Sequence, residues 1–378
     1  MSAATRELTE HVLSPSTAGP PSVPPATSSP RLISLDAYRG FIMLILASSG
    51  VGLAVLKNHD GWAWLAHQVD HAAWEGCTFW DLIQPAFTFM AGAAMPFAIA
   101  RRLELGATMP QVFRHVAWRA LLLVVLSNIF SNWGRPALSY QFINVLSQIA
   151  FGYIICFFIT RLQFPKQVGV AAAMLAGYWA LFVLFPGTDG PYSKTDHIGA
   201  VLDLKVLNIV NRGYYGTLNF VGNAVTILFG CWAGMLLRTS RSHAYKMTVM
   251  ASCAAGGFLL GLALQPWNPM VKRIWTASFT FFSAGWVVLM LLVFYWLIEV
   301  KGWKRWSFPF VVVGMNSIFI YSLGQIGLKG WLDRGLKAFT GNFSFMGDLG
   351  AIPHSIVVLA FMWYACYWLY QRRIFFKV

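Results

Sequence analysis

The segment 68–85 holds the densest group of side chains able to move a proton. It reads QVDHAAWEGCTFWDLIQP and includes Asp70, His71 and Asp81. A histidine beside carboxylates can act as a base close to neutral pH, because a hydrogen bond to a carboxylate fixes the tautomer of its ring. We therefore expect His71 to be a catalytic base and either Asp70 or Asp81 to orient it.

The same segment also has a simpler explanation. Loops rich in aromatic and charged residues often lie at the membrane surface, with their tryptophans among the lipid headgroups. Trp74 and Glu75 lie within four residues of His71. If the loop is catalytic, we expect both to bind substrate; if it is only interfacial, Trp74 anchors it to the lipid.

Further polar residues lie in or beside apolar runs, where they are costly and therefore candidates for function. Asp36 and Arg39 are three residues apart, so on a helix they share a face and can pair. We expect this pair to be structural and to shape the cytoplasmic entrance. We expect Trp275, Asn316 and Ser317 to bind substrate, although an Asn in a run of small residues also joins membrane helices.

The composition indicates which elements must position these residues. Hydrophobic residues make up 57% of the 378 residues and charged residues only 11%, whereas soluble proteins carry roughly 25% charged residues. The net charge of +14 would suit nucleic acid in a soluble protein. Here the basic residues form short clusters between apolar runs, which is typical of topology signals. We therefore predict an integral membrane protein and exclude nucleic-acid binding.

The cysteines argue against two other classes of site. The five cysteines are scattered singly in or beside apolar runs, and no CxxC pair or Cys/His cluster occurs. We therefore expect buried free thiols, with neither disulfides nor a metal site. The sequence also contains no GxxxxGK[ST] or GxGxxG signature, so a nucleotide-bearing ligand would have to be held differently.

Apolar runs long enough to cross a bilayer recur along the chain. A hydrocarbon core of about 30 Å needs about 20 apolar residues in a helix. The sequence predicts an all-α bundle of about ten such helices, at residues 38–57, 77–100, 116–133, 142–160, 168–186, 216–237, 247–265, 275–298, 308–327 and 352–370. Residues 1–30, rich in Pro, Ser and Thr, are predicted to be a disordered tail, and 31–378 to form the membrane domain.

The distribution of Lys and Arg predicts the orientation of these helices. With a cytoplasmic N-terminus, eighteen of the 28 Lys and Arg residues fall on the cytoplasmic side, as the positive-inside rule requires. Both termini are then cytoplasmic, and His71 lies in an external loop. No internal repeat of the kind found in many transporters is visible.

Several blocks of the sequence resemble the heparan-alpha-glucosaminide N-acetyltransferase family of transmembrane acyltransferases, and its bacterial members in particular. The matching blocks follow the family's order from about residue 31 to 325. They are SLDAYRG, DHAAWEGCTFWDLIQPAFTFMAG, IWTASFTFFSAGW, FYWLIEVKGW and FPFVVVGMNSIFIY. The resemblance assigns acetyl transfer to His71, the histidine of the H-x-x-W block. It also implies acetyl-CoA from the cytoplasm and an acceptor sugar on the far side.

Two positions depart from the family pattern. Residues 144–148 read NVLSQ where the family commonly reads GVLQR, and residues 214–216 read YYG where it often reads PEG. Because an Arg and a Glu are missing, the resemblance does not fix the acceptor for this chain.

We therefore expect an acetyl-CoA-dependent acyltransferase of the bacterial inner membrane, which acetylates an amine or hydroxyl of a sugar or glycan. Its acyl-binding residues would be Trp275, Asn316 and Ser317. The CoA phosphates would be bound by arginines expected at the cytoplasmic mouth, namely Arg101, Arg102, Arg114 and Arg119. A transporter or flippase of a small glycan or lipid precursor is the alternative, and a non-catalytic scaffold is a third. The sequence leaves the oligomeric state open, a homodimer included.

Overall fold

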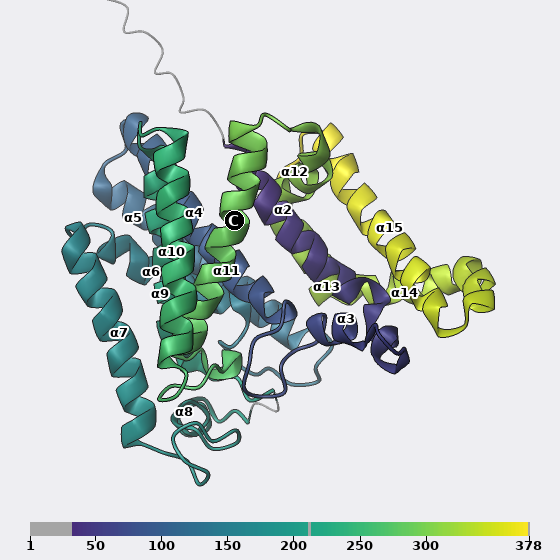
Figure 1. The fold of residues 1–378 in the computed structure, drawn as a ribbon, viewed down its shortest axis with the longest axis horizontal. Helices are drawn as coiled ribbons and strands as arrows, with labels where there is room; N and C mark the ends of the chain where they lie inside the picture. The colour runs from purple at the N-terminus through teal and green to yellow at the C-terminus, as the bar shows by residue number, and fades with distance from the viewer. Residues whose placement is uncertain (1–31, 211–212, 377–378) are drawn as a thin grey trace, which may run out of the picture. The chain divides into compact units, whose positions relative to one another are not determined.

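The computed structural model describes residues 32–210 and 213–376, most of which are helical (Figure 1). The predicted tail, residues 1–30, lies outside the described residues. Within them, the only extended pairing is an isolated bridge between Gly187 and Gly190. The α-helices are α2 (Ile33–Ser48), α3 (Ala63–Gln68), α4 (Ile83–Glu104), α5 (Met109–Asn132), α6 (Val145–Ile159), α7 (Phe164–Leu184), α8 (Ile198–Leu207), α9 (Phe220–Arg238), α10 (His243–Leu264), α11 (Ala277–Tyr295), α12 (Phe308–Met315), α13 (Ser317–Gln325), α14 (Leu328–Thr340) and α15 (Ala351–Gln371).

The membrane-spanning helices agree with the predicted all-α membrane fold. In the described part of the chain, eight helical stretches are long and apolar enough to cross a bilayer, and the bent pair α12 and α13 would make a ninth. The segment predicted at 142–160 is a shorter apolar helix, Val145–Ile159. All ten predicted segments thus fall on helices, but 142–160 is short, and 38–57 and 308–327 are interrupted. In 38–57, the α-helix ends at Ser48, and residues 49–52 have positive φ angles. The chain is a polytopic helical membrane protein.

The break between α12 and α13 corrects the prediction of a continuous helix over 308–327. The two helices meet at an angle of 63°, and Asn316 at the junction has the non-helical angles φ −127° and ψ 39°. Its Nδ2 donates to the carbonyl of Ile374 (3.1 Å), and its Oδ1 accepts from the backbone N–H of Phe376 (3.0 Å). Asn316 therefore anchors residues 374–376, and both polar atoms of its amide already have protein partners. The substrate-binding role expected for Asn316 stays a prediction. Ser317 is the first residue of α13.

Helix starts follow local signals in the sequence. The side chains of Asn144, Ser242 and Thr276 accept hydrogen bonds from backbone N–H groups in the first turns of α6, α10 and α11. Such caps satisfy donors that the helix itself leaves without a partner. The cap at Thr276 matters for the site, because it fixes the start of α11 directly after the turn Lys272–Ile274.

α4 and α9 run parallel to one another in backbone contact. A Cβ atom on Gly230 would lie 2.0 Å from the carbonyl oxygen of Phe89 and 3.0 Å from the nitrogen of Ala93, and one on Gly234 would lie 2.3 Å from the carbonyl oxygen of Ala93. Only glycine fits at such distances, as in the small-xxx-small pattern of membrane helices. Residue 230 of α9 is therefore level with residue 91 of α4, between Phe89 and Ala93.

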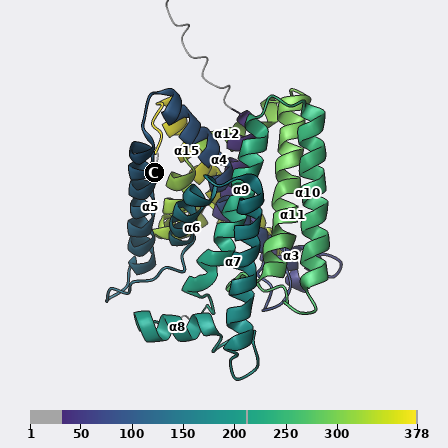
Figure 2. The same ribbon diagram turned by 90° about the vertical axis from the view of Figure 1, so that its left-hand side faces the viewer.

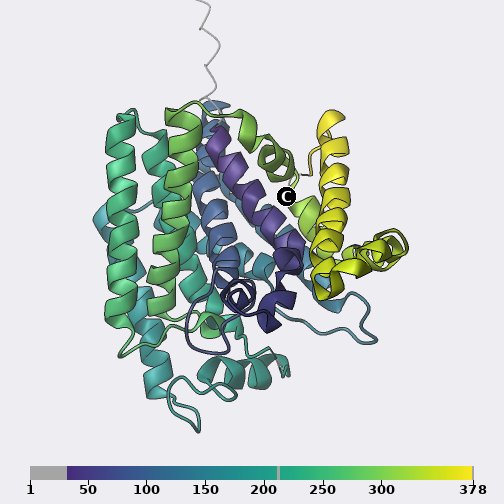
Figure 3. The same ribbon diagram turned by 45° about the vertical axis from the view of Figure 1, so that its right-hand side comes forward.

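The elements that carry the predicted catalytic residues meet at one end of the bundle. α3 and α8 lie at the end opposite to the connection between α4 and α5 (Figures 1 and 2). In Figure 3, the purple α2 descends towards α3 at this same end. α4 starts here and carries its last residues, Arg101–Glu104, to the other end.

Candidate active site

His71 and Asp81 meet where the loop before α4 folds back on the start of that helix. Nδ1 of His71 lies 2.6 Å from Oδ1 of Asp81. The His71 side chain keeps 36% of its surface exposed, whereas Asp81 keeps 2%. Asp81 lies in the 3₁₀ turn Trp80–Leu82 that leads into α4, so the helix predicted over 77–100 begins at Trp80.

The short distance fixes the tautomer of His71. An ionised carboxylate can only accept hydrogen bonds, so a contact of 2.6 Å requires that Nδ1 carries the proton and donates it to Asp81. Nε2 then has a free lone pair. None of the described residues forms a hydrogen bond with Nε2, so this nitrogen can take a proton from a bound molecule.

Asp81 is held in place by two backbone donors. Its Oδ2 accepts from the N–H groups of Ala72 (3.1 Å) and Thr78 (3.2 Å). The Thr78 hydroxyl, also 3.1 Å from Oδ2, shares its one proton with the closer carbonyl of Asp70. The ammonium of Lys272 lies 3.3 Å from Oδ1. A buried carboxylate with this many donors and a counterion stays ionised and keeps one orientation.

Lys272 is the residue of this cluster that sequence reasoning did not assign to the site. It arrives from the turn Lys272–Ile274, 201 positions from His71, and its Nζ lies 3.2 Å from the His71 Nδ1. The side chain is buried. Burial lowers the pKa of Lys272 below its usual value, although the Asp81 carboxylate acts in the opposite direction. A lysine at the edge of an apolar run was the available signal, but only the fold places it beside Asp81.

The two expected orienting residues have different roles. The Asp70 carboxylate accepts from the backbone N–H of His71 (2.7 Å), and its carbonyl accepts from the Thr78 hydroxyl (2.6 Å). Asp70 thus shapes the loop without contacting the imidazole ring, and Asp81 is the residue that orients it. Glu75 is exposed.

Trp74 joins a group of aromatic rings beside this loop. Its indole N–H donates to the carbonyl of Tyr192 (3.2 Å), and its ring centroid lies 6.4 Å from that of His197 and 6.5 Å from that of Tyr214. Burial lowers the pKa of His197, so this histidine is neutral at pH 7 and accepts the backbone N–H of Ala200 at the start of α8. Trp74 therefore connects the His71 loop to the segment before α9.

Trp275, predicted to bind substrate, lies in the core behind Lys272. It is fully buried, packs with Met270 and Phe279, and donates its indole N–H to the Thr226 hydroxyl (3.3 Å). Its backbone has a positive φ of 47°. The ring supports the turn that carries Lys272, and its one polar group is already bonded to the Thr226 hydroxyl. The binding role expected for Trp275 stays a prediction.

Cys77 is the thiol nearest to this cluster. Burial raises the pKa of Cys77 to about 12, and the negative charge of Asp81 adds to the effect. Because the thiolate is the nucleophilic form of cysteine, Cys77 stays protonated and unreactive at neutral pH.

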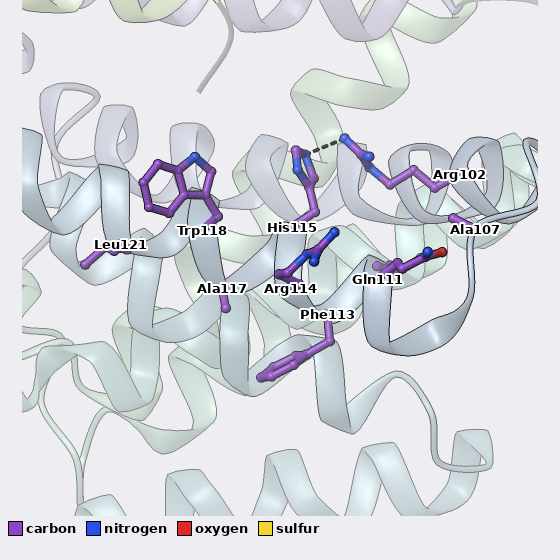
Figure 4. Close-up of a pocket in the computed structure, with 10 residues that line it drawn as sticks. Arg102, Ala107, Gln111, Phe113, Arg114, His115, Ala117, Trp118 and Leu121 are labelled. Atoms are coloured by element: carbon purple, nitrogen blue, oxygen red, sulfur yellow. Dashed lines mark hydrogen bonds between the residues drawn. The ribbon is translucent and has the colours of Figure 1, made fainter.

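A pocket lies at the other end of α4, where α5 begins. It has a volume of about 840 Å³, and its lining includes Arg102, Gln111, Arg114, His115 and Trp118 (Figure 4). The guanidinium of Arg102 forms a short hydrogen bond with Nε2 of His115 (Figure 4). The pocket therefore combines cationic groups with the exposed face of an indole.

The other two predicted arginines lie outside this pocket. Arg119 lines a smaller adjoining cavity and donates to the Tyr153 hydroxyl (3.1 Å), with its guanidinium 4.8 Å from the centre of that ring. Arg101 is exposed and lines neither cavity. Arg102 is 21 residues beyond Asp81 along one continuous helical stretch, which corresponds to about 30 Å. The pocket and the His71 cluster thus lie at opposite ends of α4.

Asp36 and Arg39 form an ion pair at the start of α2, with 3.8 Å between Oδ1 and Nη1. Glu299 caps this helix by accepting the backbone N–H of Ser34 (3.0 Å), which satisfies a free donor near the positive end of the helix dipole. In the described part of the chain, no group of three or more His, Cys, Asp or Glu side chains could hold a metal ion.

Comparison with known proteins supports the resemblance predicted from the motifs. The heparan-alpha-glucosaminide N-acetyltransferase of Homo sapiens is 24% identical over 427 aligned residues, which cover 92% of this chain and 60% of that protein. The enzyme of Mus musculus is 22% identical, with 93% and 61% covered. This chain thus spans about three fifths of the length of these relatives. No protein-family model matches it. Along nearly all of its length, the chain is similar to the heparan-alpha-glucosaminide N-acetyltransferases.

Proposed function

We propose that this membrane protein transfers an acetyl group from acetyl-CoA to an amine or hydroxyl of a sugar or glycan, with His71 as the general base. The observation that carries the proposal is the geometry of His71. Its Nδ1 is held 2.6 Å from the buried Asp81 carboxylate, while Nε2 has no partner among the described residues. This arrangement orients a base and leaves its reactive nitrogen open.

In the proposed reaction, His71, Asp81 and Lys272 have different roles. Nε2 of His71 takes the proton of the acceptor group as that group bonds to the acetyl carbon. The bond from carbon to sulfur breaks, and His71 returns the proton to the CoA sulfur. Asp81 stabilises the protonated imidazole, and Lys272 keeps Asp81 ionised. Direct attack by Nε2 would give an acetyl-histidine intermediate instead, and ping-pong kinetics would identify that route.

The basic pocket at the opposite end of α4 fits the nucleotide end of acetyl-CoA. Arg102, Arg114 and His115 can meet phosphate oxygens, and the exposed ring of Trp118 offers a stacking surface for adenine. With a volume of about 840 Å³, the pocket offers a binding surface for the head of this donor. Arg119 would add positive charge from the adjoining cavity, and the exposed Arg101 would add charge from the last turn of α4.

The distribution of Lys and Arg supports a proposal for the sidedness of the protein. We propose that both termini and the basic pocket face the cytoplasm, where acetyl-CoA is made, and that His71 faces the opposite side of the inner membrane. The pantetheine arm would then reach through the bundle towards His71. Trp74 and the aromatic rings around it would bind the acceptor, while the pair of Asp36 and Arg39 would shape the cytoplasmic side.

Acetyl-CoA turnover by purified protein in detergent tests this function. We expect wild-type protein to acetylate sugar acceptors, and His71→Ala to lower the rate by about 10² to 10⁴, the usual contribution of a positioned base. Melting should stay near that of wild type, because His71 is partly exposed. Equal rates for both proteins would remove His71 from the mechanism. Absence of turnover together with glycan uptake into proteoliposomes would favour the transporter.

Two further experiments test the basic pocket and the sidedness. Arg102→Ala combined with Arg114→Ala should raise the KM for acetyl-CoA about a hundredfold or more and leave the acceptor KM nearly unchanged, because charge-assisted bonds to phosphate contribute about 1.5–3 kcal/mol each. In sealed right-side-out vesicles, only lumenal acetyl-CoA should support acetylation of an external acceptor. Equal activity with external acetyl-CoA would contradict the transmembrane arrangement.

A further inference from the structure

Asn223 in α9 is the most unusual polar residue of the membrane core. Its side chain is completely buried, and neither Oδ1 nor Nδ2 has a hydrogen-bond partner among the described residues. A buried amide without partners costs about 1–3 kcal/mol in proteins. A ligand that accepts and donates hydrogen bonds would satisfy this amide, and a catalytic role is one known reason for such a group.

The packing of α9 against α4 places Asn223 close to the His71 cluster. Gly230 is level with residue 91 of α4, because its Cβ position lies between the backbones of Phe89 and Ala93. Seven residues earlier on a parallel helix, Asn223 is therefore level with about residue 84 or 85. This is one helical turn, or about 5–6 Å, deeper in the bundle than Asp81.

Contacts of Asn219 and Gly222 also place Asn223 near the turn that carries Lys272. Asn219 is one turn before Asn223, so both share a face of the helix. The Asn219 amide donates to the carbonyl of Arg273 (2.7 Å), in the turn that also carries Lys272. On the adjoining face, a Cβ on Gly222 would lie 2.6 Å from the Trp275 ring. Asn223 is thus one turn below a residue tied directly to the Lys272 turn.

Other asparagines inside the spans are satisfied. Both amide atoms of Asn316 bond to the backbone of the last residues described. Asn128 in α5 donates to the carbonyl of Val124 (3.0 Å) and accepts from the backbone N–H of Gln141 (3.2 Å). These two asparagines hold the fold together, whereas Asn223 contributes no such bond.

We propose that the Nδ2 of Asn223 donates a hydrogen bond to the carbonyl oxygen of the acyl thioester during transfer. The inference rests on the proposed function and assigns a catalytic residue to it. Acetyl-CoA would extend from the basic pocket at the Arg102 end of α4 towards His71. Its thioester carbonyl would then lie one helical turn deeper in the bundle than Asp81, at the level of Asn223. A preorganised amide in a water-free site is effective at stabilising negative charge that develops on oxygen.

The hydrogen bond from Asn223 matters while the thioester carbonyl oxygen carries negative charge. As Nε2 of His71 removes the acceptor proton, the acceptor bonds to the acyl carbon and the carbonyl electron pair moves onto oxygen. Asn223 stabilises that oxyanion. The electron pair then re-forms the carbonyl, the sulfur leaves as thiolate, and His71 protonates it. Asn223 thus acts on the transition state more than on the bound ground state.

The test replaces Asn223 with leucine, an apolar side chain of similar size. We expect kcat for acetyl transfer to fall about 10² to 10³-fold, the usual loss for one oxyanion donor. The affinity for CoA itself, which lacks the acyl carbonyl, should stay within about twofold. The melting temperature should equal or exceed that of wild type, because the variant removes an unsatisfied buried amide. Asn128→Leu serves as the control for the loss of an intramembrane Asn and should keep its kcat.

The alternatives give different results. An unchanged kcat in Asn223→Leu, with His71→Ala inactive, would overturn this inference and leave the proposed function intact. Weaker CoA binding at unchanged kcat would show that Asn223 binds the pantetheine arm instead. A large drop in the melting temperature of Asn223→Leu would point to a structural role. In that case Asn223→Ala, which also lacks the amide donor, decides: an unchanged kcat would overturn the inference, and a low kcat in folded protein would support it. A wild-type protein without acetyl transfer would overturn both proposals.

Discussion

Two histidine–aspartate pairs in this molecule have the same residue types but differ in how many ring nitrogens of the histidine are hydrogen-bonded. His354 in α15 lies 2.8 Å from Asp333 through Nε2 and 2.6 Å from the Thr340 hydroxyl through Nδ1. His71 contacts Asp81 through Nδ1 alone. Both ring nitrogens of His354 are therefore occupied by the protein, whereas Nε2 of His71 has no hydrogen-bond partner among the described residues.

The carboxylates differ as well. The Asp81 side chain is 2% exposed and lies against Lys272, while that of Asp333 is 41% exposed. A buried, paired carboxylate holds an imidazole strongly, and an exposed one is screened by water. The pair at His354 thus fastens α14 to α15, whereas the geometry of the pair at His71 supports the proton transfer that we propose. Reactivity depends on the free nitrogen and the burial of its partner, not on the residue pair itself.

The largest expected effect is that of Asp81→Asn. The amide can no longer accept the Nδ1 proton as a carboxylate does, so the ring loses its fixed tautomer. By analogy with the orienting carboxylate of hydrolase triads, kcat should fall about 10⁴-fold. Asp333→Asn should change it less than twofold. Steady-state acetylation assays on both variants make the comparison; equal effects would show that the two pairs do not differ in role.

Lys272→Met should have the next largest effect. It leaves Asp81 buried without its counterion, and breaking such a pair from one side typically destabilises by about 3–5 kcal/mol. We also expect an activity loss of about tenfold to a hundredfold in the protein that still folds, corresponding to about 1.4–2.7 kcal/mol. Thermal melting in detergent and kcat measure the two effects. A variant as stable and active as wild type would contradict the role of Lys272.

The pH dependence of activity tests the role of Lys272 as the counterion of Asp81, the carboxylate of the pair at His71. Because burial lowers the pKa of Lys272, this residue loses its proton at a lower pH than an exposed lysine does. Activity should therefore decline on the alkaline side as Asp81 loses its counterion. Lys272→Arg keeps its charge throughout and should show no such decline. An identical alkaline limb in both proteins would assign it to another group.

His354→Ala should affect stability and leave activity within about twofold of wild type. It removes two hydrogen bonds between α14 and α15, each contributing about 0.5–1.5 kcal/mol. Melting in detergent should show a modest decrease. Loss of acetyl transfer in a well-folded His354→Ala protein would mean that the occupied histidine is the reactive one.

The smallest effect is expected at Cys77. With its pKa raised to about 12, the thiol is protonated at neutral pH, so Cys77→Ala should retain wild-type kcat and thiol reagents should leave transfer unaffected. Inactivation by a thiol reagent that Cys77→Ala resists would instead make Cys77 part of the site.

Much of the fold is determined by the sequence itself, because lipid leaves the chain few choices. Every backbone polar group in the bilayer must bond within the protein, so long apolar runs become helices. This physics gave the ten helical segments and the fold class. The sequence could not predict the break at Asn316, because its hydrogen bonds come from residues 374 and 376, far along the chain.

The site divides in the same way. The short segment 68–85 determines that His71 and its carboxylates are neighbours, because local sequence keeps them together. The choice of Asp81 over Asp70, the arrival of Lys272 and the depth of Asn223 were decided only by tertiary structure. Lys272 is 201 positions from His71, and Asn223 reaches its level through the contact between α4 and α9. Local sequence has no information on such pairings, because they depend on how whole helices pack.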